Sequence, residues 1–218
     1  VFLSAGDSAG NLTGEQTFVR FGALKNGIAI GRHGTSAGTD FVPMSQRTFG
    51  VDNPGSVVQF RQGTGLSNAT PRIGPVVINE IQYHPLPGGD EFVELKSITN
   101  VPVKLYDPLY PTNTWRLNGV GFSFPTNTEL AANGLVLLVA TDPATFRTRY
   151  GVPGAVPICG PYPGALQGDG ENLALQCPDQ PDFDTNTGTI FIPYYDIDVV
   201  RYGDGLPWPT NADGSGAS

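Results

Sequence analysis

Short runs of apolar residues, many of them alternating with polar ones, recur along the whole chain. Each run is bounded by Gly, Pro or Asn, and four clear examples are residues 76–81, 91–95, 135–140 and 198–202. Strands with one buried face show this period of two, and the bounding residues favour turns. Three Asn-Gly pairs add signals for tight turns. The pattern therefore predicts an all-β fold.

One short helix is predicted, from Asp142 to Gly151. Asp142 can serve as the N-cap, Pro143 stands at the first helical position, and Gly151 can end the helix in a left-handed conformation. Phe146 and Tyr150 lie four residues apart, so both would face the same side and dock the helix on a sheet.

The chain also contains an internal repeat. Residues 18–22, Phe-Val-Arg-Phe-Gly, resemble residues 199–203, Val-Val-Arg-Tyr-Gly, and residues 3–7 resemble residues 175–179. The two offsets differ, which indicates nine extra residues in the later hairpin. A repeat of this kind indicates two copies of one structural unit.

The repeat suggests how the chain is organised. We interpret residues 1–50 as the C-terminal half of one repeat and residues 76–218 as most of a second copy. Residues 51–75 are rich in Pro and Gly and are interpreted as a linker. The chain begins without Met and is interpreted as a mature or excised piece of something longer.

A family resemblance rests on residues 77–85, Val-Ile-Asn-Glu-Ile-Gln-Tyr-His-Pro, followed by 90–95, Asp-Glu-Phe-Val-Glu-Leu. This opening resembles a lamin tail domain of the bacterial secreted type. Further matching segments follow in order at 115–117, 122–125, 134–140, 170–175, 200–204, 208–209 and 213–216. The resemblance implies an immunoglobulin-like β-sandwich without catalytic residues. It also implies a last strand beyond Ser218, for which residues 27–32 would be the counterpart in the first copy.

Composition narrows the possible partners. Lys and Arg number 12 and Asp and Glu 20, so the formal net charge is −8. An acidic surface argues against nucleic acid and anionic membranes as partners. The sequence has no apolar stretch of about 20 residues, so no membrane insertion is expected.

Cys159 and Cys177 are the only cysteines. Because the sequence is of an extracellular type and the two lie in neighbouring predicted strands, we predict a disulfide between them. The alternative is a pair of buried thiols.

Two serines stand in sequences that resemble protease and hydrolase motifs. Ser8 lies in Gly-Asp-Ser-Ala-Gly, and Ser36 lies in Gly-Thr-Ser-Ala-Gly after His33. A nucleophile elbow needs a helix after the serine, and the residues after Gly38 have no helical pattern. The repeat places Ser8 at a hairpin tip. We therefore predict that neither serine is catalytic and that the chain is not an enzyme.

Other polar residues give weak signals. His33 and His84 lack a second His or a Cys at ligand spacing, so zinc is not expected. Glu80, Glu91 and Glu94 are interpreted as exposed or paired with Arg116 on adjacent strands. Trp115 is predicted to lie in the core, and Trp208 to cover one end of the sandwich or to contact a ligand.

A cation site is the best chemical candidate. Asp182, Asp184 and Asn186 carry oxygen atoms at alternate positions within the nine-residue insertion. Such oxygens can converge on calcium, the one possible cofactor. The spacing departs from an EF-hand, because Pro193 stands where the bidentate Glu belongs. The alternative is an Asx-rich turn without a metal.

These observations favour a non-catalytic, extracellular or cell-surface module with a structural or adhesive role. Its expected partners are other copies of itself or neighbouring repeats, in a filament or a tandem array. Residues 1–50 would be completed either by another molecule, head to tail, or by further residues of the array. A carbohydrate- or protein-binding accessory module of a secreted enzyme is the alternative.

Overall fold

The computed structural model describes residues 1–35, 38–48 and 69–205. The chain divides into two compact units, Val1–Arg72 and Ile73–Ser218. The predicted boundary after residue 75 lies close to this division. Ser36, residues 49–68 of the predicted closing segment and linker, and Trp208 lie outside the described residues.

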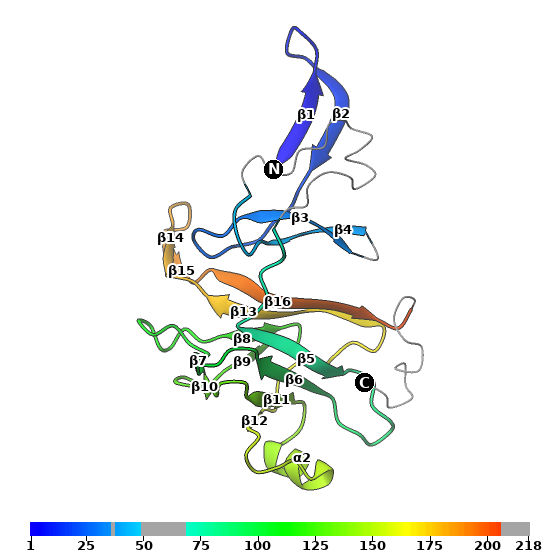
Figure 1. Cartoon of the computed structure of the whole chain (residues 1–218), viewed down its shortest axis with the longest axis vertical. Helices are drawn as coiled ribbons and strands as arrows, with labels where there is room; N and C mark the ends of the chain where they lie inside the picture. The colour runs from blue at the N-terminus through cyan, green and yellow to red at the C-terminus, as the bar shows by residue number, and fades with distance from the viewer. Residues whose placement is uncertain (36–37, 49–68, 206–218) are drawn as a thin grey trace. The chain divides into compact units, whose positions relative to one another are not determined.

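Unit 1 contains two antiparallel hairpins. Strand β1 (Phe2–Gly6) pairs with β2 (Leu12–Phe18), and β3 (Ile30–Thr35) pairs with β4 (Gly38–Pro43). Figure 1 shows both as two-stranded ribbons in blue. Met44, after β4, forms an isolated bridge with Pro71 and is 3% exposed.

Unit 2 is a β-sandwich, which confirms the predicted all-β class. Two four-stranded sheets face each other, and Figure 1 shows their long strands β5, β6, β13 and β16. Sheet one contains, in spatial order, β12 (Ile158–Cys159), β11 (Leu135–Val139), β6 (Phe92–Ser97) and β5 (Val76–Gln82). Sheet two contains β16 (Tyr194–Gly203), β13 (Gly170–Pro178), β8 (Arg116–Asn118) and β9 (Phe122–Ser123).

Two small two-stranded sheets complete unit 2. Strand β7 (Val103–Lys104) pairs with β10 (Glu129–Leu130), and β14 (Asp182–Asp184) pairs with β15 (Thr189–Phe191). The second of these is the predicted nine-residue insertion, which folds as a separate two-stranded extension between β13 and β16.

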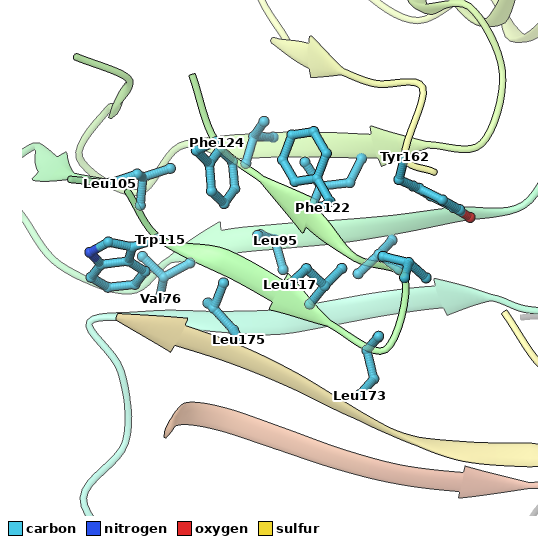
Figure 2. Packing of buried hydrophobic residues seen from close by; sticks show 14 of the residues in the cluster. Val76, Leu95, Leu105, Trp115, Leu117, Phe122, Phe124, Tyr162, Leu173 and Leu175 are labelled. Atoms are coloured by element: carbon cyan, nitrogen blue, oxygen red, sulfur yellow. The ribbon is translucent and has the colours of Figure 1, made fainter. Parts of the chain in front are cut away.

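The core of unit 2 lies between its two sheets. Figure 2 shows Leu95 of β6, Leu117 of β8 and Leu175 of β13 in this layer, and each is 0% exposed. Burying one such side chain stabilises the fold by about 1.5–3 kcal/mol. Trp115 is 4% exposed and belongs to the same cluster, so its predicted core position is confirmed.

Helix α2 (Pro143–Tyr150) forms where its end signals predict it. The side chain of Asp142 accepts a hydrogen bond from the backbone N–H of Thr145 at 2.8 Å, and Gly151 ends the helix with φ 63°. Phe146 is buried and packs edge-on against Phe92, with ring centroids 5.8 Å apart. Tyr150 is 47% exposed, so only one of the two predicted docking residues is buried. No helix in the described ranges is long and apolar enough to cross a membrane.

Candidate functional site

Two hairpins, one in each unit, have the same strand register over their inner residue pairs. The sequence repeat aligns Leu3 with Leu175 and Phe18 with Val199. In unit 1, Leu3 lies opposite Thr17. In unit 2, Leu175 lies opposite Asp198, the residue that corresponds to Thr17. The next pair agrees as well, since Phe2 opposite Phe18 corresponds to Ala174 opposite Val199. The sequence repeat is therefore also a structural repeat.

Both hairpins also carry an irregularity near the same place. In β1 the register shifts between Ser4 and Gly6, and in β13 it shifts between Leu175 and Gln176. A bulge bends a strand and increases its twist. The β1–β2 hairpin therefore resembles the β13–β16 hairpin in its inner pairing, and its register shift begins one position nearer the tip.

The two hairpins differ in burial. Core-facing side chains of the second hairpin are covered: Leu173 is 0% exposed, Leu175 0% and Tyr202 6%. Their counterparts on the first hairpin are open: Val1 is 76% exposed, Leu3 71% and Phe21 55%. An apolar face of this kind marks an interaction site in a folded protein.

In unit 2 the β13–β16 hairpin is covered by strand β8 and by sheet one. Strand β8 pairs with β13, with Leu117 opposite Leu175, and sheet one covers the face. Within the described residues β1 pairs with β2 alone. We define the hairpin surface as the side chains of Val1, Leu3 and Phe21 together with the outer edge of β1. This surface is the candidate functional site.

The opposite face of the same hairpin carries an exposed aromatic pair. The rings of Phe2 and Phe18 lie 5.5 Å apart and are 66% and 53% exposed. The guanidinium of Arg20 lies 5.5 Å from the centre of the Phe18 ring. An exposed aromatic pair is a feature that favours the alternative function, ligand binding by an accessory module.

Ser8 lies at the tip of the β1–β2 hairpin, as the repeat predicts. The neighbouring Asp7 accepts hydrogen bonds from the backbone N–H groups of Ala9 and Asn11, both at 2.9 Å. Hydrogen bonds from the Asn11 side chain and backbone lower the pKa of Asp7. The carboxylate thus holds the turn.

The histidines are far apart in sequence and lie in different units. His33 lies on β3 opposite Asp40, and His84 follows β5 with its ring 6.4 Å from that of Tyr83. Across the described part of the chain, no group of three or more His, Cys, Asp or Glu side chains could hold a metal ion.

The three glutamates do not gather around Arg116. Arg116 lies in sheet two, where it donates to Gln176 and stacks over the Tyr194 ring at 3.7 Å. Glu94 accepts from Asn79 at 2.7 Å in sheet one and lies opposite Glu80. All three glutamates are half-buried, so the expectation that they are exposed or paired with Arg116 is wrong.

A second polar arrangement has no signal in the sequence. Glu91 accepts from the hydroxyl of Tyr162 at 3.3 Å and from the backbone N–H of Leu166 at 2.9 Å. Glu171 accepts from the hydroxyl of Tyr202 at 2.8 Å and from the N–H of residue 167 at 3.3 Å. Each carboxylate therefore binds one tyrosine and one backbone group of the same loop.

These Glu–Tyr pairs hold the loop before β13 at one end of the sandwich. Tyr162 and Tyr202 are 3% and 6% exposed. Burial, with the adjacent Glu91, raises the pKa of Tyr162 well above its usual range, and burial with the hydrogen bond to Glu171 does the same for Tyr202. Both hydroxyls thus stay protonated as donors, which suits a structural role.

The candidate calcium residues lie on the β14–β15 hairpin. Asp184 accepts from the backbone N–H of Asn186 at 2.8 Å and from the Thr187 hydroxyl at 2.9 Å. The first of these bonds, together with the second, lowers the pKa of Asp184. Asp182 accepts from the next residue's N–H at 2.7 Å. These bonds form the Asx-type turn of the alternative interpretation, and calcium binding stays a prediction.

The predicted disulfide is wrong. Cys159 and Cys177 are not bonded to each other. Cys159 lies in β12 of sheet one and Cys177 in β13 of sheet two, so they are not in neighbouring strands. Both side chains are half-buried and pack against the core cluster, and burial raises the pKa of the Cys159 thiol.

No family model, characterised protein or solved structure matches this chain.

Proposed function

We propose that the chain is a non-catalytic, extracellular structural or adhesive module that is built from lamin-tail-like repeats. The observation that carries this proposal is the β1–β2 hairpin. It has the inner register of β13–β16, but it exposes the side chains whose counterparts in β13–β16 face the core. A face with Leu3 at 71% exposure is suited to burial against a neighbouring repeat. The open edge of β1 adds backbone groups that a further strand can pair.

The turn that contains Ser8 supports the non-catalytic part of the proposal. An activated serine needs a base within hydrogen-bond reach and a group that orients the base. Asp7 is instead engaged by Ala9 and Asn11 in the turn itself. A serine-directed covalent probe should therefore leave Ser8 and Ser36 unlabelled. Labelling of either residue, seen by peptide mass spectrometry, would show that the chain is an enzyme.

The adhesive part is tested by sedimentation velocity of residues 1–218 at rising protein concentration. We expect association that Leu3→Lys weakens, because the hairpin surface lies at the contact. Leu109→Lys is the matched control, since Leu109 is 74% exposed in unit 2. Association that both substitutions weaken equally, or a monomer at every concentration, would contradict the proposal.

The accessory-module alternative rests on the Phe2–Phe18 pair. Exposed aromatic side chains can stack on sugar rings. A co-sedimentation assay with insoluble polysaccharide distinguishes the two functions. Binding that Phe18→Ala removes and Leu3→Lys leaves intact would favour the alternative over the repeat module.

A further inference from the structure

The described residues contain two hairpins of this type but one set of strands that covers such a hairpin. We define the front half as residues 73–169, which include β5, β6, β8, β9, β11 and β12. In unit 2 the front half covers β13–β16. We infer that the β1–β2 hairpin is completed by a second front half, from outside residues 1–218, whose β8-type strand pairs with β1. This inference rests on the proposed function and names the partner of the hairpin surface.

A second copy of residues 1–218 can cover the hairpin surface by apolar contact, but its described residues bring no free front half whose strand could pair with β1. Each copy brings two hairpins but one described front half, which already holds β13–β16 through the pairing of β8 with β13. If the β1–β2 hairpin of one copy replaced β13–β16 on the front half of another copy, the displaced β13–β16 hairpin would be uncovered instead. One hairpin per chain would therefore still lack a front half. The ranges 49–68 and 206–218 are each far shorter than the front half. The partner is therefore a further repeat of the same type.

Unit 2 gives the register of the missing contact. Strand β8 runs antiparallel to β13, with Leu117 opposite Leu175 and Asn118 opposite Ala174. If the same register is applied to β1, the incoming strand places an apolar side chain opposite Leu3. The residue before it would lie opposite Ser4, the counterpart of Gln176. The Ser4 side chain is shorter than that of Gln176, whose oxygen accepts from Arg116 at 2.7 Å, and its hydroxyl already accepts from Gln16 at 3.1 Å, so the facing position need not be basic.

The face of the hairpin gives a second requirement. Tyr202 packs against Tyr83 of the front half, with ring centroids 4.7 Å apart, and its hydroxyl donates to Glu171. Phe21 stands in the place of Tyr202 and has no hydroxyl. The partner should therefore carry an aromatic ring at the position of Tyr83. Because Phe21 has no hydroxyl to donate, no carboxylate is needed at the position that corresponds to Glu171. Aromatic pairs of this kind add about 0.5–1.5 kcal/mol to the burial of their area.

The test adds a front half to the full chain. Residues 73–172 are placed directly before Val1, because the repeat aligns Val1 with Leu173 and the junction then has the natural spacing. Amide hydrogen exchange of β1 is followed by mass spectrometry in the extended chain and in residues 1–218. We expect exchange to slow by at least about a hundredfold in the extended chain, since β1 then gains a strand partner and a covered face.

Leu3→Lys in the same extended chain is the matched variant and should restore fast exchange of β1. Exchange of β1 that is equally fast with and without the added front half would overturn the inference, as would slowing that Leu3→Lys leaves unchanged. These outcomes are separate from failure of the proposed function, which is judged by association and serine labelling of the unextended chain.

Discussion

The carboxylate of Asp198 in β16 accepts a hydrogen bond from the backbone N–H of Ile78 in β5 at 2.8 Å. The bond links the two sheets of unit 2 directly. Ile78 stands at the bulge of β5, an edge strand of sheet one. Edge strands expose backbone donors to which other chains can add. Asp198 accepts from one of these donors, so it links the two sheets and keeps this donor from pairing with another strand.

Removal of this acceptor should destabilise unit 2. Asp198→Ala leaves the Ile78 N–H without its carboxylate, which we expect to cost about 1–3 kcal/mol. Asp198→Asn retains one acceptor oxygen and should cost less. Urea unfolding measures both, and Asp196→Ala, at a residue that accepts from Gln176, serves as a control of small effect. Equal losses for Asp198→Ala and Asp198→Asn would argue against the inter-sheet bond.

The same residue gives a prediction about pH. Burial raises the pKa of Asp198 above its ordinary value of 3.8, although the hydrogen bonds from Ile78 and Val199 oppose the shift. A raised pKa in the folded state contributes stability that is present below the ordinary pKa and is lost as pH rises through the folded pKa. Asp198→Asn should remove this part of the pH dependence in acid-range unfolding curves. Parallel curves for wild type and variant would contradict the assignment.

Leu3 and Leu175 occupy equivalent positions in the two hairpins but should respond differently to truncation. Leu175→Ala removes a fully buried side chain, and we expect a loss of about 2–5 kcal/mol. Leu3→Ala changes a side chain that is 71% exposed and should cost at most about 0.5 kcal/mol in residues 1–218. Chemical unfolding compares the two directly. A large loss for Leu3→Ala would show that the hairpin surface is already covered.

Gly170 begins β13 at a close contact between strands. Its φ is +113°, and a Cβ atom there would lie 2.5 Å from the carbonyl oxygen of Tyr202. Gly170→Ala should therefore destabilise unit 2 by about 1–3 kcal/mol through strain and displacement of β16. Gly188→Ala is the control, since Gly188 also has a positive φ but has open space around it. Thermal unfolding that ranks Gly188→Ala as the worse change would contradict this account.

Calcium binding by the β14–β15 hairpin predicts a specific pattern of melting temperatures. A chelator should lower the melting temperature of the wild type, because an ion bound only by the folded state stabilises it. Asp184→Ala should remove that sensitivity, whereas Asp204→Ala should retain it. Identical melting curves with and without chelator would leave the loop as an Asx-type turn held by Asn186 and Thr187.

Local signals predicted the local structure well. Helix α2 forms because Asp142 and Gly151 satisfy its two ends, and both residues can be identified from residue type and spacing. The hairpin repeat was predicted because its strands pair within a short stretch of sequence. Contacts between distant segments were not predictable in this way. The bond between Glu91 and Tyr162 depends on how a loop crosses the end of the sandwich.

The disulfide prediction failed for a related reason. Cys159 and Cys177 are close in sequence, but the chain passes from sheet one to sheet two between them. Closeness in sequence suggests neighbouring strands in a hairpin, whereas a crossover separates them. The layer to which each strand belongs is set by packing of the whole core, which no short window of sequence contains.

The insertion between β13 and β16 has a consequence for how such a protein can diversify. The two hairpins have the same inner register although one carries nine more residues at its tip. Residues such as Phe183 and Ile190, 55% and 73% exposed, can therefore change without disturbing the core. The hairpin tip is a place where foreign sequence can be grafted, and where successive units of one scaffold can diverge while their framework stays the same.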